Sequence, residues 1–139
     1  MSLGQEYRLL SEVPPLRVLD QRQLKLLSFV CQRLTYAPGQ TICRQGEVAD
    51  AVYVVVDGEV DVTLEHDEGE RHLRRMGRHA IIGEVGALAN SRRTASVIAA
   101  TQATALKLEQ AQFQKLLQDV PELKAAVEQH IEKADYIYE

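Results

Sequence analysis

A short stretch from Ile82 to Val97 contains the residue types best suited to binding a small molecule. Gly83 and Gly86 have no Cβ, so the backbone there can come close to a ligand. The small apolar residues between Val85 and Ala89 suit a single helical turn. The free N–H groups at the start of such a turn bind anions. This part of the stretch therefore predicts contacts between the backbone and an anionic group.

Two charged residues of the same stretch could complete a ribose-phosphate site. Glu84 can accept hydrogen bonds from sugar hydroxyls, and the planar guanidinium of Arg93 matches two phosphate oxygens. Thr94 adds a hydroxyl where a strand begins. The stretch therefore predicts a cradle for a ribose and a phosphate. A plain loop in which Glu84 and Arg93 pair with each other fits the same residues, and composition alone leaves both interpretations open.

The common catalytic and metal sites have spacings that the sequence lacks. It contains neither a Ser-centred nucleophile elbow nor a Walker-type phosphate loop, so we expect no catalytic residues and no enzyme. No histidine belongs to an HxH or HExxH pair, and no cysteine belongs to a CxxC pair or a disulfide framework. We therefore expect no metal site and two reduced thiols in a cytoplasmic protein. The residues concerned are His66, His72, His79, His130, Cys31 and Cys43.

Length and charge narrow the class of protein further. The chain has 139 residues and ordinary globular composition, which predicts a single domain with a real core. Its formal net charge of −4 argues against a nucleic-acid surface on this chain. No apolar run approaches the length of a membrane helix, and we see no secretory leader. We expect a protein that binds neither membrane nor nucleic acid by itself.

The elements that would position the cradle follow from the spacing of glycines and apolar residues. Residues 1–33 predict a helical segment, in which Asp20 would cap a helix that begins near Gln21. Residues 34–108 predict short strands that are separated by glycine turns and form a barrel or jelly roll. Residues 109–139 predict two helices, the second starting at Pro121. The expected strands cover residues 41–44, 51–56, 59–65, 71–76, 94–99 and 103–108.

Three local patterns carry more detailed expectations. Asp57-Gly58 has the character of a hairpin turn, and the alternation after it places Val60, Val62 and Leu64 on one face of a strand. Acidic residues at the next turn and arginines on the following strand predict a solvated hairpin with cross-strand charge pairs, or alternatively a docking surface. These residues are Glu65, Asp67, Glu68, Glu70, Arg71, Arg74, Arg75 and Arg78.

The last predicted helix has an apolar seam with heptad-like steps. The seam could pack on the barrel, or it could join two copies of the chain into a homodimer. Its residues are Leu123, Val127, His130, Ala134 and Ile137.

The stretch with the predicted cradle resembles the phosphate-binding cassette of cyclic nucleotide-binding domains. The resemblance rests on Gly83-Glu84-Val85-Gly86-Ala87-Leu88 and on Arg93-Thr94-Ala95-Ser96-Val97. It extends over roughly residues 15–123, with further landmarks at Tyr36-Ala37-Pro38-Gly39, Gln45-Gly46-Glu47, Asp50, Tyr53-Val54-Val55, Gly58-Glu59-Val60 and Pro121-Glu122-Leu123. The family implies an eight-stranded antiparallel jelly-roll barrel with an N-terminal helical segment and two C-terminal helices.

The resemblance also implies roles for individual residues. Glu84 would bind the ribose 2′-hydroxyl. Arg93 would bind the phosphate, rather than Arg92, because Thr94-Ala95-Ser96 fixes the register. Thr94 would let the site accept cGMP as well as cAMP, and no cofactor beyond that ligand is implied. The implied ligand-binding set is Gly83, Glu84, Val85, Gly86, Ala87, Arg93, Thr94 and Ala95. Two positions depart from the family pattern, since Ile82 replaces a usual aromatic residue and Arg92 a frequent proline.

The implied function is a cyclic nucleotide sensor that moves its C-terminal helices when ligand binds. Phe113, Leu116 and Leu117 would form the hinge, and Tyr136 or Tyr138 could cover the base. The effector is not indicated by the sequence. The alternative is a jelly-roll interaction domain with an unused pocket, acting through its charged hairpin or its C-terminal helix.

Overall fold

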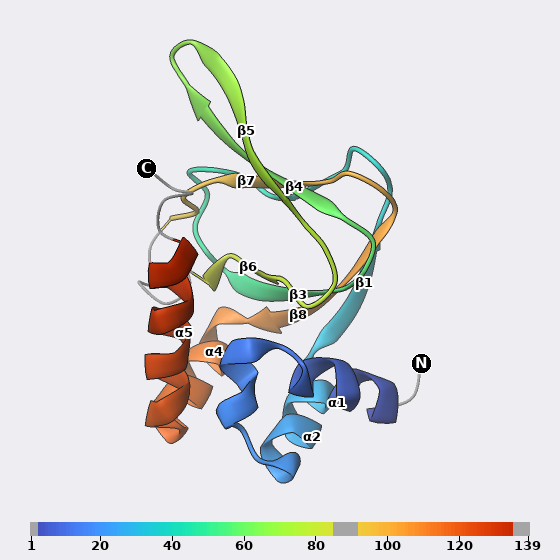
Figure 1. Cartoon of the computed structure of the whole chain (residues 1–139), viewed down its shortest axis with the longest axis vertical. Coiled ribbons are helices and arrows are strands. Elements are labelled where there is room, and N and C mark those ends of the chain that lie inside the picture. Colours follow the sequence, from blue (N-terminus) through green and yellow to red (C-terminus); the bar gives the residue numbers. More distant parts are fainter. Residues whose placement is uncertain (1–2, 85–91, 135–139) are drawn as a thin grey trace.

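Two four-stranded antiparallel sheets face one another in the computed structural model, which describes residues 3–84 and 92–134 (Figure 1). One sheet has the order β1-β8-β3-β6 and the other the order β2-β7-β4-β5. This arrangement confirms the predicted antiparallel jelly-roll barrel with flanking helices. The strands are β1 (Gln32–Tyr36), β2 (Thr41–Cys43), β3 (Ala51–Asp57), β4 (Val60–His66), β5 (Gly69–Met76), β6 (Ile81–Ile82), β7 (Ser96–Ala99) and β8 (Ala103–Glu109).

The Asp57-Gly58 turn does not form the predicted hairpin. Strand β3 pairs with β6 and β8, whereas β4 pairs with β5 and β7, so this turn carries the chain from one sheet to the other. Gly58 has a φ of 84°, and a Cβ there would overlap the carbonyl oxygen of Gln102. The glycine is therefore required by a left-handed backbone and a close approach at the edge of the barrel.

Strands β4 and β5 form the predicted charged hairpin, which projects beyond the barrel in Figure 1. A register shift between Val62 and Thr63 interrupts the predicted alternation. The extra residue at this point is Leu73 on β5, since Val62 pairs with Arg74 and Thr63 with His72. Along β4 itself, Thr63 is buried and Leu64 is half-buried, which differs from the predicted alternation. In the described part of the hairpin, Arg75 forms a cross-strand charge pair with Asp61, an acidic residue outside the predicted set: its guanidinium donates to both Asp61 carboxylate oxygens, at 2.8 and 3.1 Å.

Helical segments at both ends of the chain cover one sheet. They are α1 (Leu3–Ser11), the 3-10 helix η1 (Pro14–Val18), α2 (Gln21–Val30), α4 (Gln110–Asp119) and α5 (Pro121–Ala134). Asp20 caps α2 as predicted, in a capping box with Gln23. The first strand begins at Gln32, two residues before the predicted start of the barrel at residue 34. No helix in the described ranges is long and apolar enough to cross a membrane.

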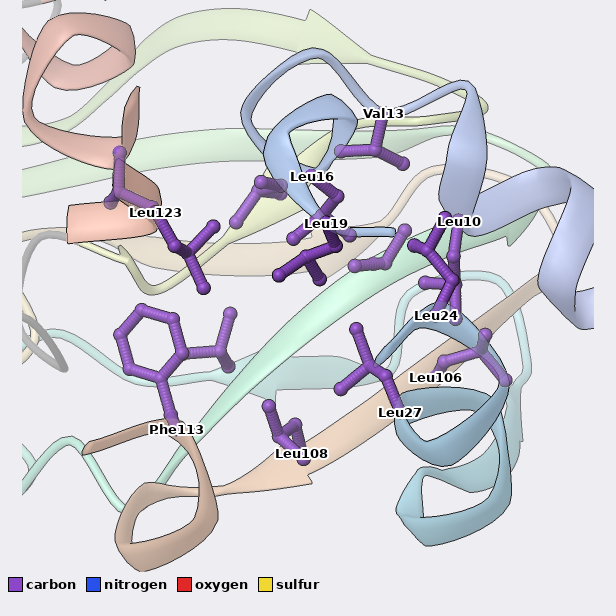
Figure 2. Close-up of a cluster of buried hydrophobic side chains, with 14 of the residues drawn as sticks. Leu10, Val13, Leu16, Leu19, Leu24, Leu27, Leu106, Leu108, Phe113 and Leu123 are labelled. Carbon is purple, nitrogen blue, oxygen red and sulfur yellow. The ribbon is translucent and has the colours of Figure 1, made fainter. Parts of the chain in front are cut away.

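Alternate residues of β3 belong to two different apolar clusters. Val52, Val54 and Val56 face the helices, whereas Tyr53 and Val55 belong to the cluster inside the barrel. Figure 2 shows the helix-side cluster, to which η1, α2, α4, α5 and strand β8 all contribute. One sheet therefore separates the barrel interior from the helices.

Two residues of the predicted seam on α5 lie in this helix-side core. Leu123 and Val127 are fully buried there, so these two side chains pack on the protein itself. His130 is half-buried, and Ile137 lies outside the described residues. For Leu123 and Val127 the structure therefore supports the packing alternative.

Candidate functional site

The predicted cradle begins where the short strand β6 ends. Ile82 pairs with Tyr53 on β3 and is buried inside the barrel. Gly83 follows with a φ of 81°, and a Cβ at this position would overlap the guanidinium of Arg93. Glycine is therefore needed at position 83 both for the left-handed backbone and for the space that Arg93 occupies.

Arg93 is buried beside this glycine. Its exposed fraction is 6%, and its guanidinium donates to the Asp50 carboxylate at 3.2 Å and to the Gly83 carbonyl at 3.4 Å. The guanidinium also lies 5.8 Å from the centre of the Tyr53 ring. A buried cation requires an anionic partner, and Asp50 supplies it from a side chain that is itself 70% exposed. An anion from solvent can therefore compete for the same guanidinium.

Backbone hydrogen bonds fix the position of Arg93. Its N–H donates to the Glu47 carbonyl at 2.7 Å, and its own carbonyl accepts from the Gly46 N–H at 3.0 Å. The neighbouring Arg92 is exposed, and its side chain donates to the Gly46 carbonyl at 2.9 Å. Arg93 is thus directed into the protein and Arg92 to its surface, an arrangement that agrees with the register expected from the sequence.

An open hollow of about 320 Å³ adjoins the Arg93 guanidinium. The ring of Tyr53 and the thiol of Cys43 belong to its wall, and burial raises the pKa of that thiol to about 11. Both cysteines are free thiols, as expected. The remaining lining residues are Ile42, Arg44, Glu47, Val48 and Asp50. The hollow gives a small anion access to Arg93 from solvent.

Glu84 occupies a very different environment from Arg93. Its exposed fraction is 3%, and its carboxylate oxygen Oε2 is buried with no hydrogen-bond partner among the described residues. Burial raises the pKa of Glu84 to about 7, although its own backbone amide and the charges of Arg74 and Arg93 act in the opposite direction. In the part of the chain that the structure describes, the ion pair of Arg93 is with Asp50 and not with Glu84.

The structure adds Arg74 to the candidate site. Sequence reasoning assigned this arginine to the solvated hairpin. However, it lies opposite Val62 in the register of β4 and β5, and Val62 faces the barrel interior. Residues directly opposite each other in an antiparallel pair share a face, so Arg74 is directed inward and is half-buried. Its charge lowers the pKa of Glu84. The sequence had already placed Val62 on the apolar face of its strand. The residue that pairs with it, Arg74, could therefore have been expected to face inward as well.

Asp50 was also missed as a functional residue. The sequence marked it only as a landmark of the family resemblance. The structure shows it directly before β3 with its carboxylate on Arg93, a long-range contact across 43 positions of the chain. No local spacing connects two residues so far apart.

The other predicted site residues lie at exposed, buried and undescribed positions. Thr94 is exposed at the edge of the site, and Ala95 is buried in the cluster inside the barrel. Of the predicted hinge residues, Phe113 and Leu117 are buried and Leu116 packs against the same core. Val85, Gly86, Ala87, Tyr136 and Tyr138 lie outside the described residues.

The chain resembles proteins of known function over most of its length. A family model for the cyclic nucleotide-binding domain matches residues 33–120. The chain is 31% identical over 91 residues to a cAMP-dependent protein kinase type II regulatory subunit from Drosophila melanogaster, covering 66% of this chain and 24% of that protein. It is 32% identical over 83 residues to a cGMP-dependent protein kinase from Eimeria tenella, covering 60% of this chain and 8% of that protein.

A solved structure shows the same architecture. The regulatory subunit of a cAMP-independent protein kinase A from Trypanosoma brucei superposes with a TM-score of 0.79 at 27% identity, over 91% of this chain and 48% of that one. The fold and the site define a jelly-roll barrel of the ligand-binding, regulatory kind. The chain belongs to the cyclic nucleotide-binding domain family. It spans about a quarter or less of the length of the two curated relatives.

Proposed function

We propose that this domain binds a cyclic nucleotide with Arg93 on the phosphate and Glu84 on the ribose. The observation that carries the proposal is the buried Arg93 guanidinium, which is held by backbone hydrogen bonds and paired with an exposed carboxylate. Charged hydrogen bonds between arginine and phosphate are short and strong. A phosphate that enters the adjoining hollow would take over donors that Asp50 engages in the free protein. Gly83, Val85, Gly86, Ala87, Thr94 and Ala95 would complete the cradle.

Both cAMP and cGMP are candidate ligands, and two residues favour acceptance of cGMP. The Thr94 hydroxyl can accept a hydrogen bond from the guanine 2-amino group, which adenine lacks. Arg74 is directed into the barrel near Glu84, and an arginine fork matches the O6 and N7 acceptors of guanine. We therefore infer that cGMP binds at least as well as cAMP.

The domain acts by ligand-dependent movement of its C-terminal helices rather than by catalysis. Phe113, Leu116 and Leu117 lie on α4, between the barrel and α5, and would form the hinge. The family model is that of a binding domain, and one named relative is a regulatory subunit, which supports a non-catalytic signalling role. A cytoplasmic location is part of the same proposal. The same proposal includes an output partner that responds to this movement, and a homodimer in which two copies of the chain associate through the C-terminal helix.

Thermal melting with added nucleotide tests the proposal. A ligand at about 100 times its dissociation constant adds roughly 2.7 kcal/mol to the free energy of unfolding. We expect cAMP and cGMP to raise the melting temperature, and 5′-AMP and guanosine to raise it far less, because they lack the cyclic phosphate. Stabilisation by guanosine alone would identify a nucleoside site. No stabilisation by any of these compounds would favour the interaction domain with an unused pocket.

A further inference from the structure

An open apolar groove of about 370 Å³ lies between helices α2 and α4. The buried side chains of Leu27 and Leu108, both labelled in Figure 2, belong to its lining, as do the exposed side chains of Leu26 and Val30 on α2. On the side of α4 the lining includes Leu116, Val120, Lys115 and Asp119. The groove is far from the hollow beside Arg93 in composition as well as in lining, since the two share no residue.

Helix α2 carries an exposed apolar stripe beside this groove. Leu26, Phe29 and Val30 are 60%, 71% and 47% exposed, and they are three of the five large hydrophobic residues that are exposed in the described ranges. Their spacing of three and four residues places them on one face of the helix. Single exposed apolar residues are normal, but a group of them on one face marks a contact surface. A stripe next to a groove is the shape that an amphipathic helix recognises.

The charges around the groove favour an acidic partner. Helix α2 contains Arg22 and Lys25 and no acidic residue, although the whole chain has a formal net charge of −4. Both side chains are exposed and, together with Phe29, line an adjoining hollow of about 360 Å³. Within the described ranges neither forms an ion pair, whereas Lys115 and Asp119 pair with each other at 3.3 Å. The unbalanced charge beside the apolar stripe is therefore positive.

We propose that the surface formed by α2 and α4 docks an amphipathic helix that carries acidic residues beside its apolar face. Apolar side chains of this partner fill the groove over Leu27 and contact Phe29, and its carboxylates pair with Arg22 and Lys25. A concave groove fits a convex helix, whereas a lipid surface offers nothing to fill it. The proposal goes beyond the proposed function and does not depend on cyclic nucleotide binding.

Fluorescence anisotropy with three labelled peptides tests this surface on the intact chain. Each peptide has about 18 residues, roughly five helical turns, with leucines at the spacing of one helix face. The flanking positions are glutamate in the first peptide, glutamine in the second and lysine in the third. We expect affinity to fall in that order, by roughly tenfold from the glutamate to the lysine peptide, and the difference to shrink in high salt.

Substitutions of exposed residues test the apolar part of the surface without disturbing the core. Phe29→Ala and Leu26→Ala should each weaken binding of the glutamate peptide by about fivefold or more, because a few central anchors carry most of the binding energy. Val18→Ala is the matched control: Val18 is 42% exposed on η1 and lines neither hollow. This substitution should leave the affinity unchanged.

A second pair of variants tests the charges. Lys25→Glu should weaken binding of the glutamate peptide and strengthen binding of the lysine peptide. Arg71→Glu makes the same change of charge at an exposed position of β5, in the hairpin that lies at the opposite end of the molecule from α2 in Figure 1. It should have neither effect.

Other results would overturn the proposal. They are failure of all three peptides to bind, equal affinity for the glutamate and lysine peptides, and equal losses from Phe29→Ala and Val18→Ala. Binding to phosphatidylserine vesicles that Phe29→Ala removes would assign a membrane surface instead. A dimer in sedimentation experiments that the same substitution dissociates would assign a second copy of the chain. Cyclic nucleotide binding, measured on the same variants, should be unchanged, and its absence would overturn the proposed function while leaving the docking surface in place.

Discussion

At the scale of single residues, the site contains two ionisable groups that are buried in different ways. Arg93 keeps its charge because Asp50 and the Gly83 carbonyl accept hydrogen bonds from its guanidinium. Glu84 has no such partner for Oε2, so burial shifts it toward the neutral acid. The Arg93 guanidinium is therefore available to an anion, whereas burial disfavours the charged form of Glu84.

The contrast between two adjacent arginines gives the first prediction. Arg93→Ala should weaken cyclic nucleotide binding by roughly 10- to 150-fold, because a charged hydrogen bond contributes about 1.5–3 kcal/mol. Arg92→Ala, which removes an exposed side chain bonded to the Gly46 carbonyl, should change the affinity little. Fluorescence titration with a labelled cyclic nucleotide measures both. Equal losses would show that the register of the cassette is wrong.

Thr94 carries the prediction about base choice. Thr94→Ala should reduce the affinity for cGMP by about 1 kcal/mol more than the affinity for cAMP, since one neutral hydrogen bond to the guanine 2-amino group is lost. Competition binding with both nucleotides on native and variant protein measures the difference. A native site that accepts only cAMP, or equal losses for both ligands, would leave Thr94 without a role in selecting the base.

At the scale of elements, the two ends of the chain form one helical layer over a single sheet. Helix α5 packs on η1, and α4 packs on β3 and β8. Since η1 comes from the N-terminal segment and α5 from the C-terminal one, neither can move alone without exposing apolar surface of the other. The described part of α5 is therefore a structural element of the free domain as well as a candidate moving part.

Two leucines test how much α5 contributes to stability. Leu123 is 0% exposed and Leu26, on the outer side of α2, is 60% exposed. Leu123→Ala should lower the free energy of unfolding by about 2–5 kcal/mol, as is usual when a buried leucine leaves a cavity. Leu26→Ala should change it by less than about 1 kcal/mol. Urea denaturation followed by circular dichroism compares the two, and similar small effects would mean that α5 is not held in the core.

At the scale of the whole molecule, the sheet β1-β8-β3-β6 separates the ligand side from the helix side. Residues such as Tyr53 and Val54 are neighbours in the chain but belong to the two opposite clusters. The candidate site lies where β6 leaves this sheet, so Glu84 is next to the helix-side core while Arg93 is next to the solvent-exposed hollow. Glu84 therefore borders the same small cavity as Phe113, Leu116 and Val127.

Stability of the free domain should depend on pH in a direction that Glu84 sets. Its pKa is about 7 in the folded protein and about 4.5 ordinarily, so the folded state binds more protons between these values. Stability should therefore fall as the pH rises through this window, by up to about 3 kcal/mol from Glu84 alone. Asp61 acts in the opposite direction at lower pH, because hydrogen bonds from Arg75 lower its pKa and their contribution is lost on acidification. Urea denaturation between pH 4 and pH 8 measures both trends.

Patterns that depend only on neighbouring residues were readable from the sequence. The N-cap at Asp20, the helix start at Pro121 and the short strands between glycine turns all follow from local propensity and from periodicity. The pairing of strands was less accessible, because Asp57-Gly58 has the same local chemistry whether it joins two paired strands or two sheets. The bulge at Leu73 was likewise not predictable from local sequence, since it exists only in the register between β4 and β5.

For the site, the sequence by itself determined which residues could bind a ribose and a phosphate, because residue type and spacing establish chemical capacity. Only the tertiary structure decided the charged partners and the burial of these residues. Asp50, 43 positions away, became the counter-ion of Arg93, and the register of the hairpin turned Arg74 toward Glu84. Burial in the folded domain gave Glu84 its raised pKa. Desolvation and charge pairing depend on distance in space, and local sequence does not encode the distance between residues that folding brings together.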